Sequence, residues 1–171
     1  QQTSYTWTST NTSIGLSSGG SGNIPGFTAA NTTVDVISSQ IDIIPSAYGC
    51  QGDVNSFYIT VNPLPNVSSV PNQTHCAGEM SDEIILNADA SGSTISWVSS
   101  DQTIGIGASG NSTISSFETI NTGNTVVSAT ISAQAELNSC SGPTTSFSIT
   151  INPIPTVNIT GLIALCDGQN S

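Results

Sequence analysis

The four cysteines are the residues of this chain best suited to covalent cross-linking. Each is followed two positions later by a glycine: Cys50, Cys76, Cys140 and Cys166. Structural zinc sites use Cys-x-x-Cys or Cys/His pairs at short spacing, and this spacing does not match them. The pattern therefore predicts disulfides, with free buried thiols as the alternative.

Catalytic and metal-binding residues are scarce. His75 is the only histidine, and no G-x-S-x-G elbow accompanies it, so we expect no catalytic residue and no enzyme activity. The acidic residues have no Lys or Arg partner, and we expect water to solvate them. No metal site or cofactor is predicted, although Ca²⁺ at domain joints is an alternative, because hard cations bind carboxylate and carbonyl oxygens. The acidic residues considered are Asp53, Asp82, Glu83, Asp89, Asp101 and Asp167.

Two features could relate to sugars. Trp7 and Trp97 could stack on a glycan, but each alternates with polar neighbours as in a strand, which favours a place in the core. N-x-S/T sequons give six candidate glycosylation sites, at Asn11, Asn31, Asn66, Asn72, Asn111 and Asn158.

The chain repeats itself after 90 residues. SFYITVNPLP at 56–65 returns as SFSITINPIP at 146–155, and the same offset relates Trp7 to Trp97 and Cys50 to Cys140 without insertion or deletion. Such a period predicts a tandem array. Residues 1–65 would form one repeat that lacks its first strands, 66–155 a complete repeat, and 156–171 the opening strand of a further repeat.

Apolar residues alternate with polar ones in short β-branched segments that end at prolines, which is typical of strands with one buried face. The sequence therefore predicts an all-β fold of tandem immunoglobulin-like β-sandwiches. Strands are expected at 36–44, 57–61, 67–70, 83–90, 94–99, 113–120, 125–137 and 146–152. The expected core residues are Ile84, Leu86, Ala88, Ile95, Trp97, Phe117, Val127, Ile131, Phe147, Ile149 and Ile151.

The repeat suggests how the cysteines pair. Within the complete repeat, Cys76 and Cys140 would close a loop of about 65 residues, worth roughly 4 kcal/mol by loop entropy. Cys50 and Cys166 would then lack partners within their own copy. We expect Cys166 of one copy to pair with Cys50 of the next.

Several motifs resemble the PKD-like, immunoglobulin-like repeats of Bacteroidota secreted surface proteins. They are W-T-S-T-N-x-x-I-G-L from Trp7, G-x-G-x-I-x-x-F from Gly20, C-x-G, and F-x-I-T-V-N-P-x-P from Phe57, with W-V-S-S-D-x-x-I-G-I, C-S-G and F-S-I-T-I-N-P-I-P in the second copy. The resemblance implies β-sandwiches in long secreted arrays that act as stalks, adhesins or fibres. It brings no catalytic residues.

Composition excludes several partners. The 171 residues include no Lys or Arg and eleven acidic groups, for a formal charge of −11. Such a chain cannot neutralise phosphates, so we expect no nucleic-acid binding and no attraction to anionic membranes. No apolar run is long enough to span a bilayer, and we expect an extracellular, cell-surface location.

The function expected from these patterns is a structural subunit of an extracellular bacterial filament whose partner is another copy of itself. The tail would be donated as a strand to that copy through Val157, Ile159, Leu162, Ala164 and Cys166. The alternative is an adhesive stalk module of a longer secreted repeat protein, with surface glycans or Ca²⁺ bound by the loops 17–22 and 107–112.

Overall fold

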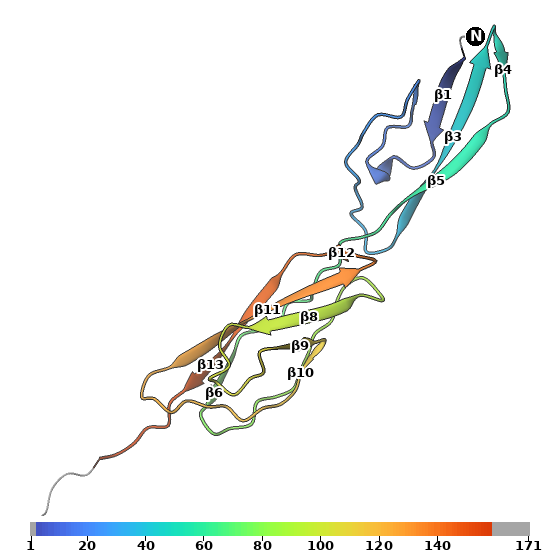
Figure 1. The fold of residues 1–171 in the computed structure, drawn as a ribbon. Coiled ribbons are helices and arrows are strands. Elements are labelled where there is room, and N and C mark those ends of the chain that lie inside the picture. The colour runs from blue at the N-terminus through green and yellow to red at the C-terminus, as the bar shows by residue number, and fades with distance from the viewer. Residues whose placement is uncertain (1–2, 159–171) are drawn as a thin grey trace, which may run out of the picture.

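The computed structural model describes residues 3–158, which form two groups of strands that follow one another along an elongated molecule (Figure 1). Strands make up nearly all of its regular structure. A single 3₁₀ turn, η1 (Thr12–Ile14), is the one helical element in this range. Among these residues no helix has the length and apolar character needed to cross a membrane.

The first group is one antiparallel sheet, which we call the N-terminal unit. Its strands are β1 (Ser4–Ser9), β2 (Gly19–Ser21), β3 (Ile37–Ala47), β4 (Cys50–Gln51) and β5 (Asn55–Val61). The order is β2-β1-β3-β4, and β5 also pairs with β3.

The second group, the C-terminal unit, contains two sheets. The larger sheet has the order β6-β13-β11-β8-β9, with β12 on β11, and the smaller sheet pairs β10 with β7. The β6–β13 pair is parallel, and the other pairs of this unit are antiparallel. The strands are β6 (Gln73–Cys76), β7 (Ile84–Ile85), β8 (Thr94–Ser99), β9 (Ser109–Asn111), β10 (Thr113–Ile114), β11 (Val127–Leu137), β12 (Cys140–Ser141) and β13 (Thr145–Asn152).

The strand bounds of the two units differ by the offset of 90 seen in the sequence. β1 to β5 correspond in this way to β8, β9, β11, β12 and β13, and β13 alone is one residue longer. Within residues 3–158, the N-terminal unit has no counterpart of β6, β7 or β10. Each unit therefore has its own sheet with the same arrangement of strands, and the two units differ in the segments that cover this sheet.

The core of the C-terminal unit follows the predicted alternation. Eight of the predicted residues are buried, and Ala88, Phe117 and Val127 are partly buried against them. The alternation did not identify the small residues Ala129, Ala133 and Ala135 of β11, or Ile104 and Ile106 in the loop after β8, all of which are buried.

Three predicted strands are shorter or displaced. The strand predicted at 67–70 is only a bridge between Val67 and Ala88; the ladder forms after Pro71, in β6. Proline has no N–H to donate, so pairing resumes where the chain runs beside β13. The strands predicted at 83–90 and 113–120 reduce to β7 and β10.

The two segments 17–22 and 107–112, which the alternative function assigned to ligand-binding loops, each contain a short strand. Gly19–Ser21 is β2 and Ser109–Asn111 is β9, and each pairs with the strand that carries the tryptophan. A Cβ on Gly20 would lie 2.7 Å from the Trp7 ring, and one on Gly110 would lie 2.8 Å from the Trp97 ring. The glycines therefore let an edge strand lie against an indole, and both tryptophans are buried, as predicted.

Candidate functional site: a groove beside β5

The inward-facing residues of β5 are more exposed than those of β13. Phe147 is 4% exposed, and Ile149 and Ile151 are fully buried, whereas Phe57 is 41% exposed and Ile59 and Val61 are half-buried. The residues are the same or similar in type, so the difference comes from what covers them. In the C-terminal unit that cover is the segment 67–86.

This covering segment is held on two sides. β6 pairs with Ile149–Asn152 of β13, and the Ala77 N–H then donates to the Asn152 carbonyl at 3.0 Å. On the other side the Gly78 N–H donates to the carbonyl of Thr119 at 2.7 Å. The Thr119 hydroxyl donates to the Cys76 carbonyl at 2.7 Å. The segment thus closes the space between β13 and the loop around Thr119.

The corresponding space in the N-terminal unit is a groove of about 610 Å³. One wall is residues 29–32 and the other is residues 59–62, with Leu64 and Cys140 also lining it. These walls correspond, at the offset of 90, to 119–122 and 149–152. The groove is therefore the place that β6 and the residues after it occupy in the C-terminal unit.

A second opening of about 320 Å³ lies over Trp7 and is lined also by Tyr5, Ile24 and Phe57. The buried Trp7 Nε1 has no hydrogen-bond partner there. Trp97 Nε1, by contrast, donates to the Thr113 carbonyl at 3.2 Å, in β10. Leaving a buried donor unpaired costs about 1–3 kcal/mol, so this side of the N-terminal unit is also incomplete.

Searches with models of protein families and against curated proteins found no match to this chain.

The groove residues Ala29–Thr32 were not recognised in the sequence, although the offset of 90 onto Thr119–Thr122 could have identified them.

The structure contradicts the predicted Cys76–Cys140 disulfide, because both cysteines are free and lie at opposite ends of the C-terminal unit. Cys76 lies opposite Asn152, the last residue of β13, whereas Cys140 pairs with Leu137, before β13 begins. At about 3.3 Å per residue, β13 alone spans roughly 23 Å. A disulfide needs Cα atoms within about 7 Å.

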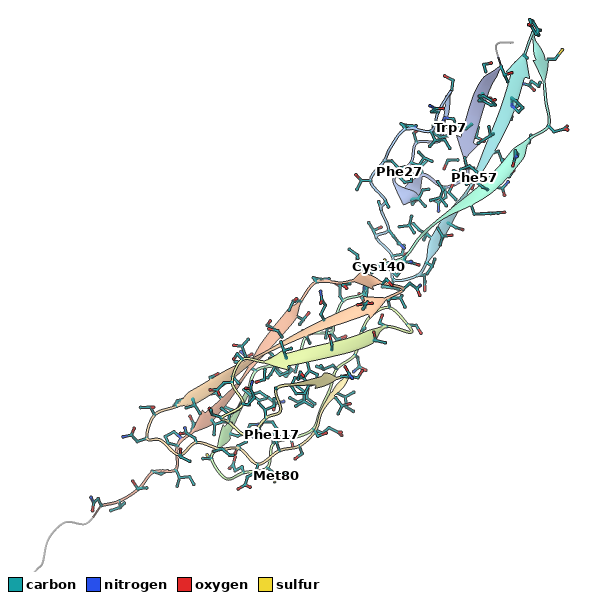
Figure 2. The ribbon with its side chains drawn as sticks, viewed as in Figure 1. Trp7, Phe27, Phe57, Met80, Phe117 and Cys140 are labelled. Carbon is teal, nitrogen blue, oxygen red and sulfur yellow. The ribbon has the colours of Figure 1, made fainter. Side chains whose placement is uncertain are left out.

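Cys140 lies where the two units meet, far from Met80 and Phe117 at the other end of the C-terminal unit (Figure 2). Next to it, Asn138 Nδ2 donates to Asn62 Oδ1 at 3.2 Å, across the joint. Cys50 is free and exposed on β4, at the far tip of the N-terminal unit (Figure 1). Cys166 lies outside the described residues, as do the predicted donor residues other than Val157, which is 87% exposed.

The joint requires the glycine of the third C-x-G motif. A Cβ on Gly142 would overlap the Pro65 carbonyl oxygen, whereas one on Gly52 would lie 3.0 Å from the Pro45 ring and 3.8 Å from the Pro45 carbonyl oxygen. We expect Gly142→Ala to destabilise the C-terminal unit by about 1–3 kcal/mol through this overlap. Gly52→Ala, the matched control, should leave the monomer within about 0.5 kcal/mol of wild type in urea denaturation, and an equal effect of the two would contradict this account of the joint.

The residues considered as candidates for catalysis or metal binding do not lie close to one another. No three His, Cys, Asp or Glu side chains within 3–158 gather as metal ligands would. His75 is half-buried, with Nε2 3.2 Å from Gln73 Oε1. Asp53, Asp82 and Glu83 are exposed, and Asp167 lies outside the described range.

Two acidic side chains serve local structure. Hydrogen bonds from the side chain and backbone of Asn66 hold the pKa of Asp89 below its ordinary value. Those from the hydroxyl and backbone of Thr103 do the same for the pKa of Asp101. Asp89 therefore ties its segment to Asn66, and Asp101 holds the local turn that leads to Thr103. The two carboxylates are not gathered into one site.

Three of the sequon asparagines use the nitrogen to which a glycan would be attached. Asn31 Nδ2 donates to the carbonyls of Asp35 and Val61. Asn11 Nδ2 and Asn66 Nδ2 donate to the Ser38 carbonyl and to Asp89. Asn72, by contrast, accepts a bond from the Ser148 N–H, and Asn111 and Asn158 are exposed.

Proposed function

We propose that this protein is a structural, non-enzymatic subunit of an extracellular filament built from tandem immunoglobulin-like domains of the PKD-like type. The tail 156–171 of one copy would enter the groove of the next copy and complete its N-terminal unit. The observation that carries this proposal is the groove beside β5, which lies where the C-terminal unit places its own residues 73–81.

The tail has the sequence that this groove needs. It continues the offset of 90 from residues 66–81, so that Val67, Cys76, Gly78 and Ser81 recur in the tail as Val157, Cys166, Gly168 and Ser171. The half-buried Gln73 and His75 of β6 correspond to Ile163 and Leu165, which are more apolar. Burying apolar area contributes about 25 cal/mol per Å², which suits a strand held without covalent continuity.

Donation of this kind produces a polymer. The donor segment is at one end of the chain and the acceptor groove is near the other, so the contact is heterologous and does not close. Adding a strand to an open sheet edge satisfies both the backbone groups and the apolar face. The charge of −11, with no cations, would keep neighbouring filaments apart laterally.

The test is electron microscopy and sedimentation of the full chain with reductant present. We expect filaments that dissociate, in denaturant and reductant, to a single species of one chain mass. A chain that remains monomeric at high concentration, with the groove open to solvent, would contradict strand donation.

The second candidate is an adhesive stalk module of a longer secreted repeat protein, which could bind glycans or Ca²⁺. It is favoured by the same groove, because a covalently preceding segment would fill the groove equally well. High-mass material from the native source that survives denaturant and reductant together would support this candidate and exclude the filament.

A further inference from the structure

The ladder between β6 and β13 fixes where a donated tail would place its cysteine. Cys76 lies opposite Asn152 in that ladder. At the offset of 90 these positions are Cys166 and Asn62. A tail that enters the groove as β6 does would therefore bring Cys166 beside Asn62.

Cys140 lies at the same place. It lines the groove together with Asn62, and its neighbour Asn138 is bonded to the Asn62 side chain at 3.2 Å. Cys50, the partner predicted from sequence, is on β4 at the opposite end of the N-terminal unit. The nearest thiol to a donated Cys166 is then the acceptor's Cys140.

The same reasoning applies one joint further along. Asn62–Pro65 leads from the first unit into the second, and Asn152–Pro155 repeats it at the end of the second unit. Suppose that the N-terminal unit of the next copy is placed after Pro155 as the C-terminal unit is placed after Pro65. Cys50 of that copy then has the same position relative to Asn152 that Cys140 has relative to Asn62. Cys50 then lies near Asn152. The ladder partner of Asn152 is Cys76, which is exposed and has a free thiol.

We infer that each contact between copies is locked by two disulfides, from Cys166 to Cys140 of the next copy and from Cys76 to Cys50 of the next copy. The inference rests on the proposed strand donation. The bond from Cys166 would fasten the donated strand at one end of the acceptor's N-terminal unit, and the bond from Cys76 would fasten the donor's C-terminal unit to the other end. All four cysteines would be used.

Each bond forms by thiol–disulfide exchange with an external protein disulfide. One cysteine thiolate attacks that disulfide and releases one of its sulfurs as a thiol. The second cysteine thiolate then displaces the other sulfur. The two cysteines together lose two electrons and two protons, and the oxidant leaves as a dithiol.

Double serine variants of the full chain, assembled in reductant and then oxidised, test the pairing. C50S/C76S retains Cys140 and Cys166, and C140S/C166S retains Cys50 and Cys76. Each should give a ladder of chain multiples in non-reducing denaturing gels that collapses on reduction. C76S/C140S, which retains Cys50 and Cys166, should migrate as a single chain and serves as the control.

Electron microscopy before oxidation tests strand donation separately from the disulfide pairing. Filaments that form in reductant but give no ladder with the first two variants, or a ladder only with C76S/C140S, would overturn the pairing and leave strand donation standing. Absence of filaments from the wild-type chain would overturn both.

Discussion

Replacing Leu165 with aspartate should abolish filament formation at concentrations where the wild-type chain assembles, whereas the same change at Ala164 should leave assembly intact. The two residues correspond to His75 and Thr74 of β6, which are half-buried and exposed respectively. An aspartate at 165 would place a carboxylate in the apolar groove, in a chain without any Lys or Arg to pair with it. We expect at least a roughly 100-fold rise in the critical concentration.

Sedimentation in reductant measures this effect without any contribution from disulfides. The two variants carry the same net charge, so a general electrostatic effect would appear in both. The sequence alone predicted Ala164 as a residue through which the strand is donated, together with Val157, Ile159, Leu162 and Cys166. Equal loss of assembly in both variants would contradict the alignment of the tail with β6.

Phe147→Ala and Phe57→Ala should differ strongly in the isolated chain although they change equivalent residues. Phe147 is 4% exposed inside a closed core, and truncating it should destabilise the C-terminal unit by about 3–5 kcal/mol. Phe57 is 41% exposed, so its truncation should cost less than about 1.5 kcal/mol in the monomer. Chemical denaturation of the monomer measures both changes.

Phe57→Ala should have little effect on the monomer but a large effect on filament assembly. In the C-terminal unit the segment before β6 passes beside Phe147, since the Ser148 N–H donates to Asn72 Oδ1 at 2.8 Å. A donated tail would cover Phe57 in the same way, and Phe57→Ala should therefore raise the critical concentration by roughly tenfold or more. No change in assembly would show that the tail does not reach this part of the sheet.

The sequence predicted those parts of the fold that local patterns specify. β8 matches its predicted bounds, and β11 and β13 lie within a residue or two of theirs, because long runs of alternating residues fix which face is buried. β6 was missed because Gln73–Cys76 has no apolar alternation; tertiary pairing with β13 makes it a strand.

The cysteine pairing failed for a related reason. Alternation of apolar and polar residues predicts which face of a sheet a side chain is on. It does not predict which residue of the neighbouring strand lies opposite. Cys76 and Cys140 belong to one repeat, yet the parallel ladder puts Cys76 at the end of β13, away from Cys140. The groove, by contrast, could be anticipated from the offset of 90, because residues 1–65 contain no counterparts of residues 66–90.

The parallel pairing of β6 with β13 also determines how the C-terminal unit responds to pulling. The chain enters this unit near Pro65 and leaves it after Asn152, and the two strands run side by side in the same direction. Tension on the two ends therefore slides one strand along the other and loads their hydrogen bonds in shear, so that the bonds must break together instead of unzipping one by one. Such a geometry makes forced rupture slow, because forced unfolding is governed by the height of the unfolding barrier.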